Sequence, residues 1–444
     1  MKLLKYSSIT TLILVTVACQ QVNTHSTLAN QAENNLHNSS ENINFLAFGD
    51  GGYSVDYPKK KHIENPLNKT QFIAKEKQDW LEDYRPITEF DHAPIHVYPE
   101  SGIATEASGA IPVGQAMATL CKQRLCEFGI QLGDNIYPDG ADADDGKDDQ
   151  KRMDDLILGP LLPLFEQTPE LVVYSALGNH DWKTSRKGIA LQTEWMTKQK
   201  NFHMDKQGYY RYTKGEPGNE VEFFVLDTNM LLAGQTFYEV PLNPDGSEGK
   251  LDIALKAGTA ELEVHEKHEG PQNNEDKIQL QWLKEGLANS TAKWKIVYGH
   301  HILWSIGGTK YSEGHVLRKL IMPTLCQYAD AYIAGHEHDL ELLTDDCSLY
   351  PESKSVEALP LIISGAASKM RGKHTPFANY QEKTYPQYEL LWSKSFTWGF
   401  SHINIDNVND QLNVEFFTTP RDGNGKLTSE YRHTFSRRIA KNVE

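Results

Sequence analysis

Five short segments of the sequence place a potential metal-ligating side chain directly after a glycine. They are Gly49-Asp50, Gly133-Asp134, Gly178-Asn179-His180-Asp181, Gly299-His300 and Gly335-His336-Glu337-His338. Carboxylate and amide oxygens and imidazole nitrogens suit hard or borderline ions such as Fe, Mn or Zn. Because no cysteine belongs to the set, the pattern indicates an oxygen and nitrogen site rather than a thiolate site.

Each segment alone is weak evidence. A Gly-Asp pair is usually a turn, since Asp and Asn bond to nearby backbone, and a His-X-His segment is also compatible with a polar turn. The joint occurrence of all five, each after an apolar run, is what predicts a shared metal site.

The apolar runs predict the elements that must position these side chains. Strands are expected at 43–48, 126–132, 171–177, 221–227, 293–298, 331–334, 359–366, 398–406 and 412–418. Helices are expected at 115–122, 154–165, 275–287 and 314–328. Strands alternating with helices indicate an α/β protein whose sheet is covered on both faces. In such folds ligands collect at the carboxyl ends of the strands, where the glycines would let the chain turn sharply.

The N-terminus predicts export. Lys2 and Lys5 precede an apolar stretch at 9–18, which ends at Cys19. This resembles a bacterial lipoprotein signal, with 1–18 removed and Cys19 lipidated, although Thr16 stands where an aliphatic residue is usual. The alternative is a periplasmic or secreted protein with cleavage nearby. A flexible tether is expected at 19–42.

The rest of the chain predicts one domain at 43–420 and a C-terminal tail at 421–444. Two polar stretches near 53–110 and 229–274 are expected to be insertions of loops and short elements.

Four cysteines remain after Cys19. An exported chain can form disulfides, and the pairs closest in sequence are Cys121–Cys126 and Cys326–Cys347. Four cysteines allow three connectivities, so the pairing stays open.

The formal net charge of −16 disfavours nucleic acid as a partner. An anionic substrate would need local positive charge, for which bound metal is the obvious source.

The ordered motifs resemble those of the calcineurin-like metallophosphoesterase superfamily. The variant of the second motif that has Tyr137 three residues after Asp134 resembles the purple acid phosphatase branch, especially its small tartrate-resistant type. The resemblance runs from about Ile43 to Thr419, apart from the two insertions. It implies a four-layer α/β/β/α sandwich with two mixed sheets and a dinuclear metal site at the strand C-terminal ends.

The resemblance also implies the ligands of two ions. Fe(3+) would be bound by Asp50, Asp134, Tyr137 and His338. A divalent ion, Fe, Zn or Mn, would be bound by Asp134, Asn179, His300 and His336. Asp134 would bridge the ions, because its two oxygens can each reach one.

Three further side chains are candidates near the substrate. His180 would stand just outside the metal ligands and contact the substrate phosphate, with Asp181 either orienting it or forming a turn. His315 is a candidate acid in a flexible loop that would face the substrate. The alternative is that His315 is a solvent-exposed loop histidine without a catalytic role. His301 replaces an expected aromatic residue and could bind phosphate or compete with His300 as a ligand.

The implied function is an acid phosphatase that hydrolyses small phosphate monoesters through metal-bound hydroxide. A phosphodiesterase or nucleotide hydrolase on the same site is the first alternative. A non-catalytic surface lipoprotein is the second, which a missing ligand would favour, and none is missing. Membrane contact is expected only through a lipid on Cys19, and the oligomeric state stays open.

Overall fold

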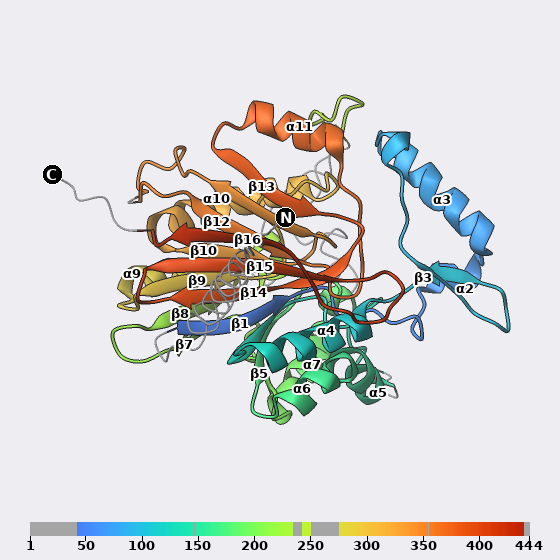
Figure 1. Cartoon of the computed structure of the whole chain (residues 1–444), viewed down its shortest axis with the longest axis horizontal. Helices are drawn as coiled ribbons and strands as arrows, with labels where there is room; N and C mark the ends of the chain where they lie inside the picture. The colour runs from blue at the N-terminus through green and yellow to red at the C-terminus, as the bar shows by residue number, and fades with distance from the viewer. Residues whose placement is uncertain (1–41, 145–147, 234–241, 250–274, 354, 439–444) are drawn as a thin grey trace, which may run out of the picture. The chain divides into compact units, whose positions relative to one another are not determined.

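The computed structural model describes residues 42–144, 148–233, 242–249, 275–353 and 355–438 (Figure 1). The expected signal segment and the expected tether lie outside the described residues, except for Asn42, which begins the first strand. So do most of the second expected insertion and the last six residues of the expected tail.

The first of two large sheets has β1 (Asn42–Phe48) near its centre. Its order is β16-β15-β14-β1-β4-β5-β6. The other strands are β4 (Phe128–Leu132), β5 (Val172–Ala176), β6 (Phe202–His203), β14 (Trp398–Asp406), β15 (Gln411–Thr419) and β16 (Thr428–Ser436). The strands β1, β4, β5 and β6 run parallel, whereas β14, β15 and β16 join by antiparallel pairing. The first sheet is therefore mixed.

The second sheet is mixed as well, in the order β13-β11-β12-β10-β9-β8-β7. Its strands are β7 (Tyr210–Lys214), β8 (Val221–Val225), β9 (Trp294–Tyr298), β10 (Ala331–Ala334), β11 (Leu340–Asp345), β12 (Leu359–Ser364) and β13 (Tyr388–Lys394). Parallel pairing joins β8, β9, β10 and β12.

A buried core joins the inner faces of the two sheets. Phe45 and Phe128 of the first sheet stack with ring centroids 5.0 Å apart, and Phe223 of the second sheet meets Phe45 edge-on at 5.3 Å. Each of these side chains is almost fully buried, which stabilises the fold by roughly 2–3 kcal/mol per ring relative to exposure.

Helices cover both outer faces. A second core lies between the first sheet and α4 (Ala110–Gln123), α5 (Asp149–Met153), α6 (Leu162–Gln167) and α7 (Arg186–Lys198). A third lies between the second sheet and α8 (Thr228–Ala233), α9 (Glu275–Asn289) and α10 (Tyr311–Tyr328). The four-layer α/β/β/α sandwich with two mixed sheets is thus confirmed (Figure 1).

The insertion at 53–110 folds into short elements that reach the domain through a few side chains. These elements are α2 (Lys60–Glu64), α3 (Lys69–Glu82) and the hairpin β2 (Ile95–Val97) and β3 (Ala104–Glu106). Trp80 of α3 stacks on Phe396 at 5.8 Å. Arg85 donates to the carbonyls of Gly372 (2.6 Å) and Gly307 (3.0 Å).

The expected C-terminal tail contains a strand. Residues 428–436 form β16 and pair antiparallel with β15 at the edge of the first sheet. Tyr431 and Phe435 pack against the core between the sheets, and the half-buried His433 lies between their rings, whereas Arg432 and Thr434 are exposed. The tail expectation was wrong because an edge strand needs only this sparse alternation.

Two disulfide bonds stabilise the fold. The disulfides Cys121–Cys126 and Cys326–Cys347 are both formed, so pairing by proximity is confirmed. Among the described residues, no helix has both the length and the apolar composition of a membrane span.

Candidate metal centre

The strand ends turn at the candidate ligands themselves. Asp50, Asp134 and His336 have φ values of 58°, 54° and 68°. These are left-handed conformations that cost roughly 1–2 kcal/mol for a residue with a side chain. The sequence interpretation assigned the turn to the preceding glycines alone, and this was incomplete.

The glycines allow the strand ends to approach one another closely. A Cβ on Gly335 would lie 2.7 Å from Oδ2 of Asp50. A Cβ on Gly133 would lie 2.8 Å from Nδ1 of His300 and from the backbone nitrogen of Gly178. Since real Cβ atoms do not come this near, a larger residue would push the candidate ligands apart.

One group of donor atoms gathers around the hydroxyl of Tyr137. The hydroxyl lies 2.6 Å from Oδ2 of Asp134, 3.1 Å from Oδ1 of Asp50 and 3.1 Å from Nε2 of His338. His338 Nε2 is 3.2 Å from the same Asp50 oxygen. All four side chains are buried, and they are the four predicted for the first ion.

A second group gathers around Nε2 of His300. This atom lies 2.9 Å from Nδ1 of His336, 3.1 Å from Oδ1 of Asn179 and 3.4 Å from Oδ1 of Asp134. His300 is oriented by its other nitrogen, which lies 2.8 Å from the Leu132 carbonyl. These are the four residues predicted for the second ion, and the two oxygens of Asp134 face different groups.

The donor groups fit two metal ions. Ligand atoms about 2.1 Å from one ion lie roughly 3.0–3.4 Å from each other, close to the spacings in both groups. The imidazole nitrogens of His300 and His336 point at each other, which suits two neutral ligands sharing an ion. The site therefore accommodates a dinuclear centre with oxygen and nitrogen ligands.

Burial controls the charge of these groups. It raises the pKa of Asp50, with a further contribution from the neighbouring Asp134 carboxylate. For Asp134, burial acts in the same direction, but the imidazoles of His300 and His180 and the Tyr137 hydroxyl hold its pKa well below the usual range. Burial lowers the pKa of His336 and His338. A neutral His336, a neutral His338 and an ionised Asp134 are the protonation states that metal binding requires of these groups.

His180 lies beside the first donor group. Its backbone N–H donates to Oδ1 of Asp134 at 2.8 Å, and its ring packs 4.1 Å from the Tyr137 ring. Asp181 does not contact that ring. Its carboxylate accepts from the backbone N–H groups of Asn135, Ile136 and Gly178 and so holds the turn that carries Asp134. The turn-forming alternative for Asp181 matches its position.

His301 lies behind the second donor group. It is buried, its Nδ1 is 2.7 Å from the Thr228 hydroxyl, and its ring packs 4.4 Å from that of His336. Its hydrogen bonds do not reach Asp134 or Asn179, whereas His300 reaches both. The structure therefore favours His300 as the ligand.

The structure does not bring His315 to the site. His315 lies in α10, not in a loop, and its Nδ1 is 3.4 Å from the Arg318 guanidinium. Glu313 of the same helix approaches instead, with Oε2 2.7 Å from Nε2 of His336. Sequence reasoning missed Glu313 because the helix was expected to begin at Gly314, which left Glu313 outside it.

A cavity of about 390 Å³ opens beside the first donor group. Tyr137, His180 and His338 form part of its wall, and Trp80 and Arg85 of the insertion form another part. The insertion near 53–110, unreadable from sequence, thus shapes the approach to the centre.

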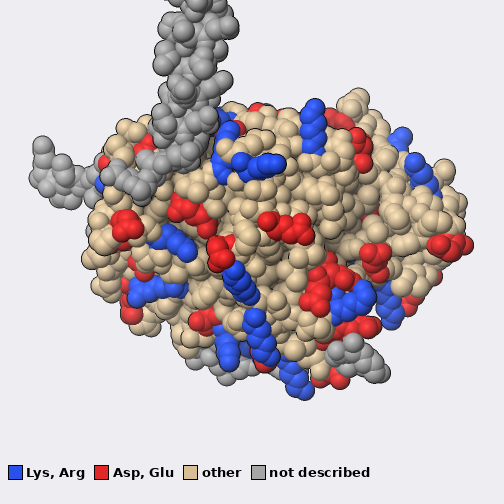
Figure 2. All heavy atoms as spheres, turned by 60° about the horizontal axis from the view of Figure 1, so that its bottom comes forward, with Lys and Arg blue, Asp and Glu red and all other residues tan. Residues whose placement is uncertain are grey.

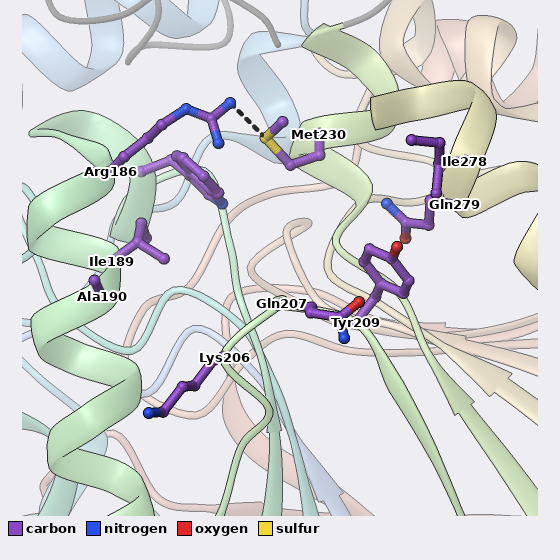
Figure 3. A pocket seen from close by; sticks show the side chains of 11 residues that line it. Arg186, Ile189, Ala190, Lys206, Gln207, Tyr209, Met230, Ile278 and Gln279 are labelled. Atoms are coloured by element: carbon purple, nitrogen blue, oxygen red, sulfur yellow. Dashed lines mark hydrogen bonds between the residues drawn. The ribbon is translucent and has the colours of Figure 1, made fainter. Parts of the chain in front are cut away.

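Another cavity, of about 380 Å³, lies beyond Trp182 and includes none of the candidate ligands (Figure 3). Arg186 stands over the Trp182 ring at 5.4 Å and points toward Met230 across the cavity. The residues that line this cavity are different from those that line the cavity beside the first donor group.

Residues 128–340 match the calcineurin-like phosphoesterase family, and they contain all the candidate ligands except Asp50. The matched residues make up slightly less than half of the chain. The matched family is the superfamily that the motifs resembled. The strands outside the matched segment belong to the same two sheets as those inside it.

Two sets of relatives are similar to this chain. Tartrate-resistant acid phosphatase type 5 of Sus scrofa is 27% identical over 259 residues, which are 58% of this chain and 63% of the relative. Purple acid phosphatase 17 of Arabidopsis thaliana is 24% identical over 258 residues, 56% of this chain and 61% of the relative. The chain thus spans slightly less than two thirds of the length of these relatives.

Among solved structures, GAP50, the anchor in the inner membrane complex of Plasmodium, has the same fold. The alignment covers 90% of each chain at a TM-score of 0.52 and 15% sequence identity. At this identity the likeness concerns the fold alone, so function has to be argued from the donor groups.

Proposed function

We propose that the protein is a metal-dependent acid phosphatase that hydrolyses phosphate monoesters at a dinuclear centre. The observation that carries this proposal is the position of Asp134, whose Oδ2 belongs to the Tyr137 group and whose Oδ1 belongs to the His300 group. A binding protein that had lost catalysis would have no need to keep a bridging carboxylate and both complete donor groups.

Two bound ions would neutralise the charge of a phosphoryl group and activate water for attack on phosphorus. The chain's own residues hold the rest of the arrangement. Asp181 fixes the turn of Asp134, and the Leu132 carbonyl fixes the ring of His300. His180 lines the cavity beside Tyr137 and is placed to contact a phosphoryl oxygen of the substrate.

Tyr137 supports Fe(III) as the ion of the first group. A free phenol has a pKa of about 10. Burial raises the pKa of Tyr137 further, and the Asp134 and Asp50 carboxylates add to this effect. Binding as a phenolate therefore requires a strongly polarising cation, which Fe(III) provides better than Mg or Zn. The second group would hold Fe, Zn or Mn.

The proposal is tested by the turnover of p-nitrophenyl phosphate and of its bis ester, together with the metal content of the purified protein. We expect hydrolysis of the monoester, fastest at mildly acidic pH, and at least a hundredfold loss in Asp134→Asn (an expectation of the order set by a lost catalytic group). Asp139→Asn is the matched control, because Asp139 lies in the same loop with an exposed side chain.

Each result has a distinct meaning. Preference for the bis ester would make the protein a phosphodiesterase on the same site. Absence of both bound metal and ester hydrolysis would return the non-catalytic alternative. From residues 1–19 alone, we further propose export and lipid attachment at Cys19, which mass spectrometry of the mature N-terminus tests.

A further inference from the structure

Lys59 is an unpaired cation in the wall of the cavity that leads to the candidate metal centre. It belongs to the insertion, directly before α2, and is only partly exposed. It makes no hydrogen bond or ion pair with any of the described residues. A half-buried ammonium without a partner is costly, so its presence in this wall needs a reason.

The other cations of the cavity wall already have partners. Lys369 pairs with Glu106, and Arg371 pairs with Glu337 at 2.8 Å. Arg85 donates to two backbone carbonyls and lies 3.5 Å from Asp83.

The carboxylates of the wall form no ion pair with Lys59, and Glu106, whose charge raises the pKa of Lys59, pairs with Lys369. Asp79 pairs with Lys75 and Asp91 pairs with Arg421, both outside the wall. Glu76 is exposed and makes no ion pair with Lys59; partial desolvation and the Glu106 and Asp79 carboxylates raise its pKa. Lys59 therefore remains the free positive charge of the described wall.

Positive charge from three parts of the chain gathers near His180. Lys369 and Lys183 both act on Lys59, and with burial they lower its pKa to about 8. Lys183 lies with its Nζ 3.1 Å from both ring nitrogens of His180. Lys369 lies over the ring of Tyr53 at 4.2 Å and that of Tyr137 at 5.9 Å. At mildly acidic pH Lys59 is protonated, and like charges around it make an added anion favourable.

This concentration of charge is local. The face shown in Figure 2 mixes Lys and Arg with Asp and Glu over its visible area, and the whole chain is acidic. A substrate anion would therefore be recognised by individual lysines in the cavity rather than by a broad basic surface.

We propose that Lys59, together with Lys369, forms a subsite for a second phosphate of the substrate, so that the preferred substrates are phosphate esters with two phosphate groups. The inference rests on the proposed function, since the first phosphate would lie at the metal centre. The second phosphate would provide the partner that Lys59 lacks.

The kinetic test compares fructose 6-phosphate with fructose 1,6-bisphosphate. We expect the wild type to prefer the bisphosphate in kcat/KM. Lys59→Gln should lower kcat/KM for the bisphosphate about tenfold, as for loss of one charge-assisted hydrogen bond, and for the monophosphate less than twofold. Lys60→Gln is the matched control, because the Lys60 side chain is 88% exposed and near only Glu64.

A binding test works without turnover. Pentane-1,5-diphosphonate and pentylphosphonate carry carbon–phosphorus bonds that the protein cannot hydrolyse, and calorimetry gives their dissociation constants. We expect tighter binding of the diphosphonate to the wild type and to Lys60→Gln, and loss of that preference in Lys59→Gln. Equal affinities in the wild type, or equal losses in the two variants, would overturn the subsite. Failure to hydrolyse p-nitrophenyl phosphate would instead overturn the proposed function, and the diphosphonate result would still decide the subsite.

Discussion

Glu313 Oε2 lies 2.7 Å from Nε2 of His336, whose other ring nitrogen, Nδ1, faces His300. The carboxylate accepts the Nε2–H, which fixes the tautomer in which Nδ1 of His336 is free to bind an ion. Glu313 is thus a positioning residue for the second donor group.

Removal of this hydrogen-bond acceptor should weaken the binding of the second ion. We expect Glu313→Ala to lower its affinity by about 10–100-fold, measured by competition with a chelator, and Glu313→Gln to recover part of the loss because the amide oxygen can still accept. His315→Ala is the control in the same helix. If His315→Ala were as damaging as Glu313→Ala, the effect would belong to the helix rather than to the contact.

Tyr137→Phe tests the identity of the first ion. If the first group holds Fe(III), the purified protein should absorb visible light as an iron–phenolate pair, and the variant should lose that absorption and bind the first ion less tightly. An absorption spectrum with metal analysis gives both results. An active, fully metallated, colourless wild type would exclude Fe(III) while leaving the phosphatase proposal intact.

Gly133→Ala should disrupt the centre through shape alone. The residue has φ of 87°, and an added Cβ would lie 2.8 Å from Nδ1 of His300. We expect a loss of roughly 3 kcal/mol in unfolding free energy, measured by urea denaturation, and a lower metal content.

Gly102→Ala is a control that measures the cost of a positive φ without a steric clash. Gly102 has a φ of 69°, and no atom lies within 4 Å of the added Cβ. It should cost only about 1 kcal/mol and leave the metal content unchanged. Equal metal contents in the two variants would contradict the collision.

Asp330, which is not one of the candidate ligands, should make the free energy of unfolding depend on pH. Burial raises its pKa to about 6, above the value of about 3.9 expected when unfolded. As pH rises from 4 to 6 the unfolded state loses its proton first, so the free energy of unfolding falls, and the loss is complete above pH 6.

Asp330→Asn should remove this loss. The amide oxygen can still accept from the Lys295 N–H, which the carboxylate does at 2.8 Å. Relative to the wild type, the variant should gain about 2–3 kcal/mol between pH 4 and pH 7 in urea denaturation. A constant difference across that range would show that Asp330 does not titrate as described.

The donor groups were predictable because every ligand lies within five residues of the end of a strand, and Asp50, Asp134, His300 and His336 each stand two residues after it. Asp50, Asp134 and His300 are marked by an apolar run and a glycine, and these signals are local. Parallel pairing brings the strand ends of each sheet together, and packing of the two sheets then joins the ligands that follow β1, β4 and β5 to those that follow β9 and β10.

The contacts that depend on tertiary packing left no such signal. Helix α3 buries only Phe72 and Trp80, so its sequence lacks a clear apolar period, and the position of Lys59 beside it was unreadable. Glu313 meets His336 only because α10 begins at Tyr311. Tyr431 and Phe435 are too few to mark β16 as a strand.

The place of β1 has a consequence for how the chain is made. Asn42 is the register partner of Asp406, so a strand synthesised early has one neighbour, β4, soon after it and the other only near the end of translation. Until residue 406 has left the ribosome, one edge of β1 stays open. The nascent polypeptide is thereby kept from completing its first sheet, and a chain stopped before β14 would expose that edge to association with other chains.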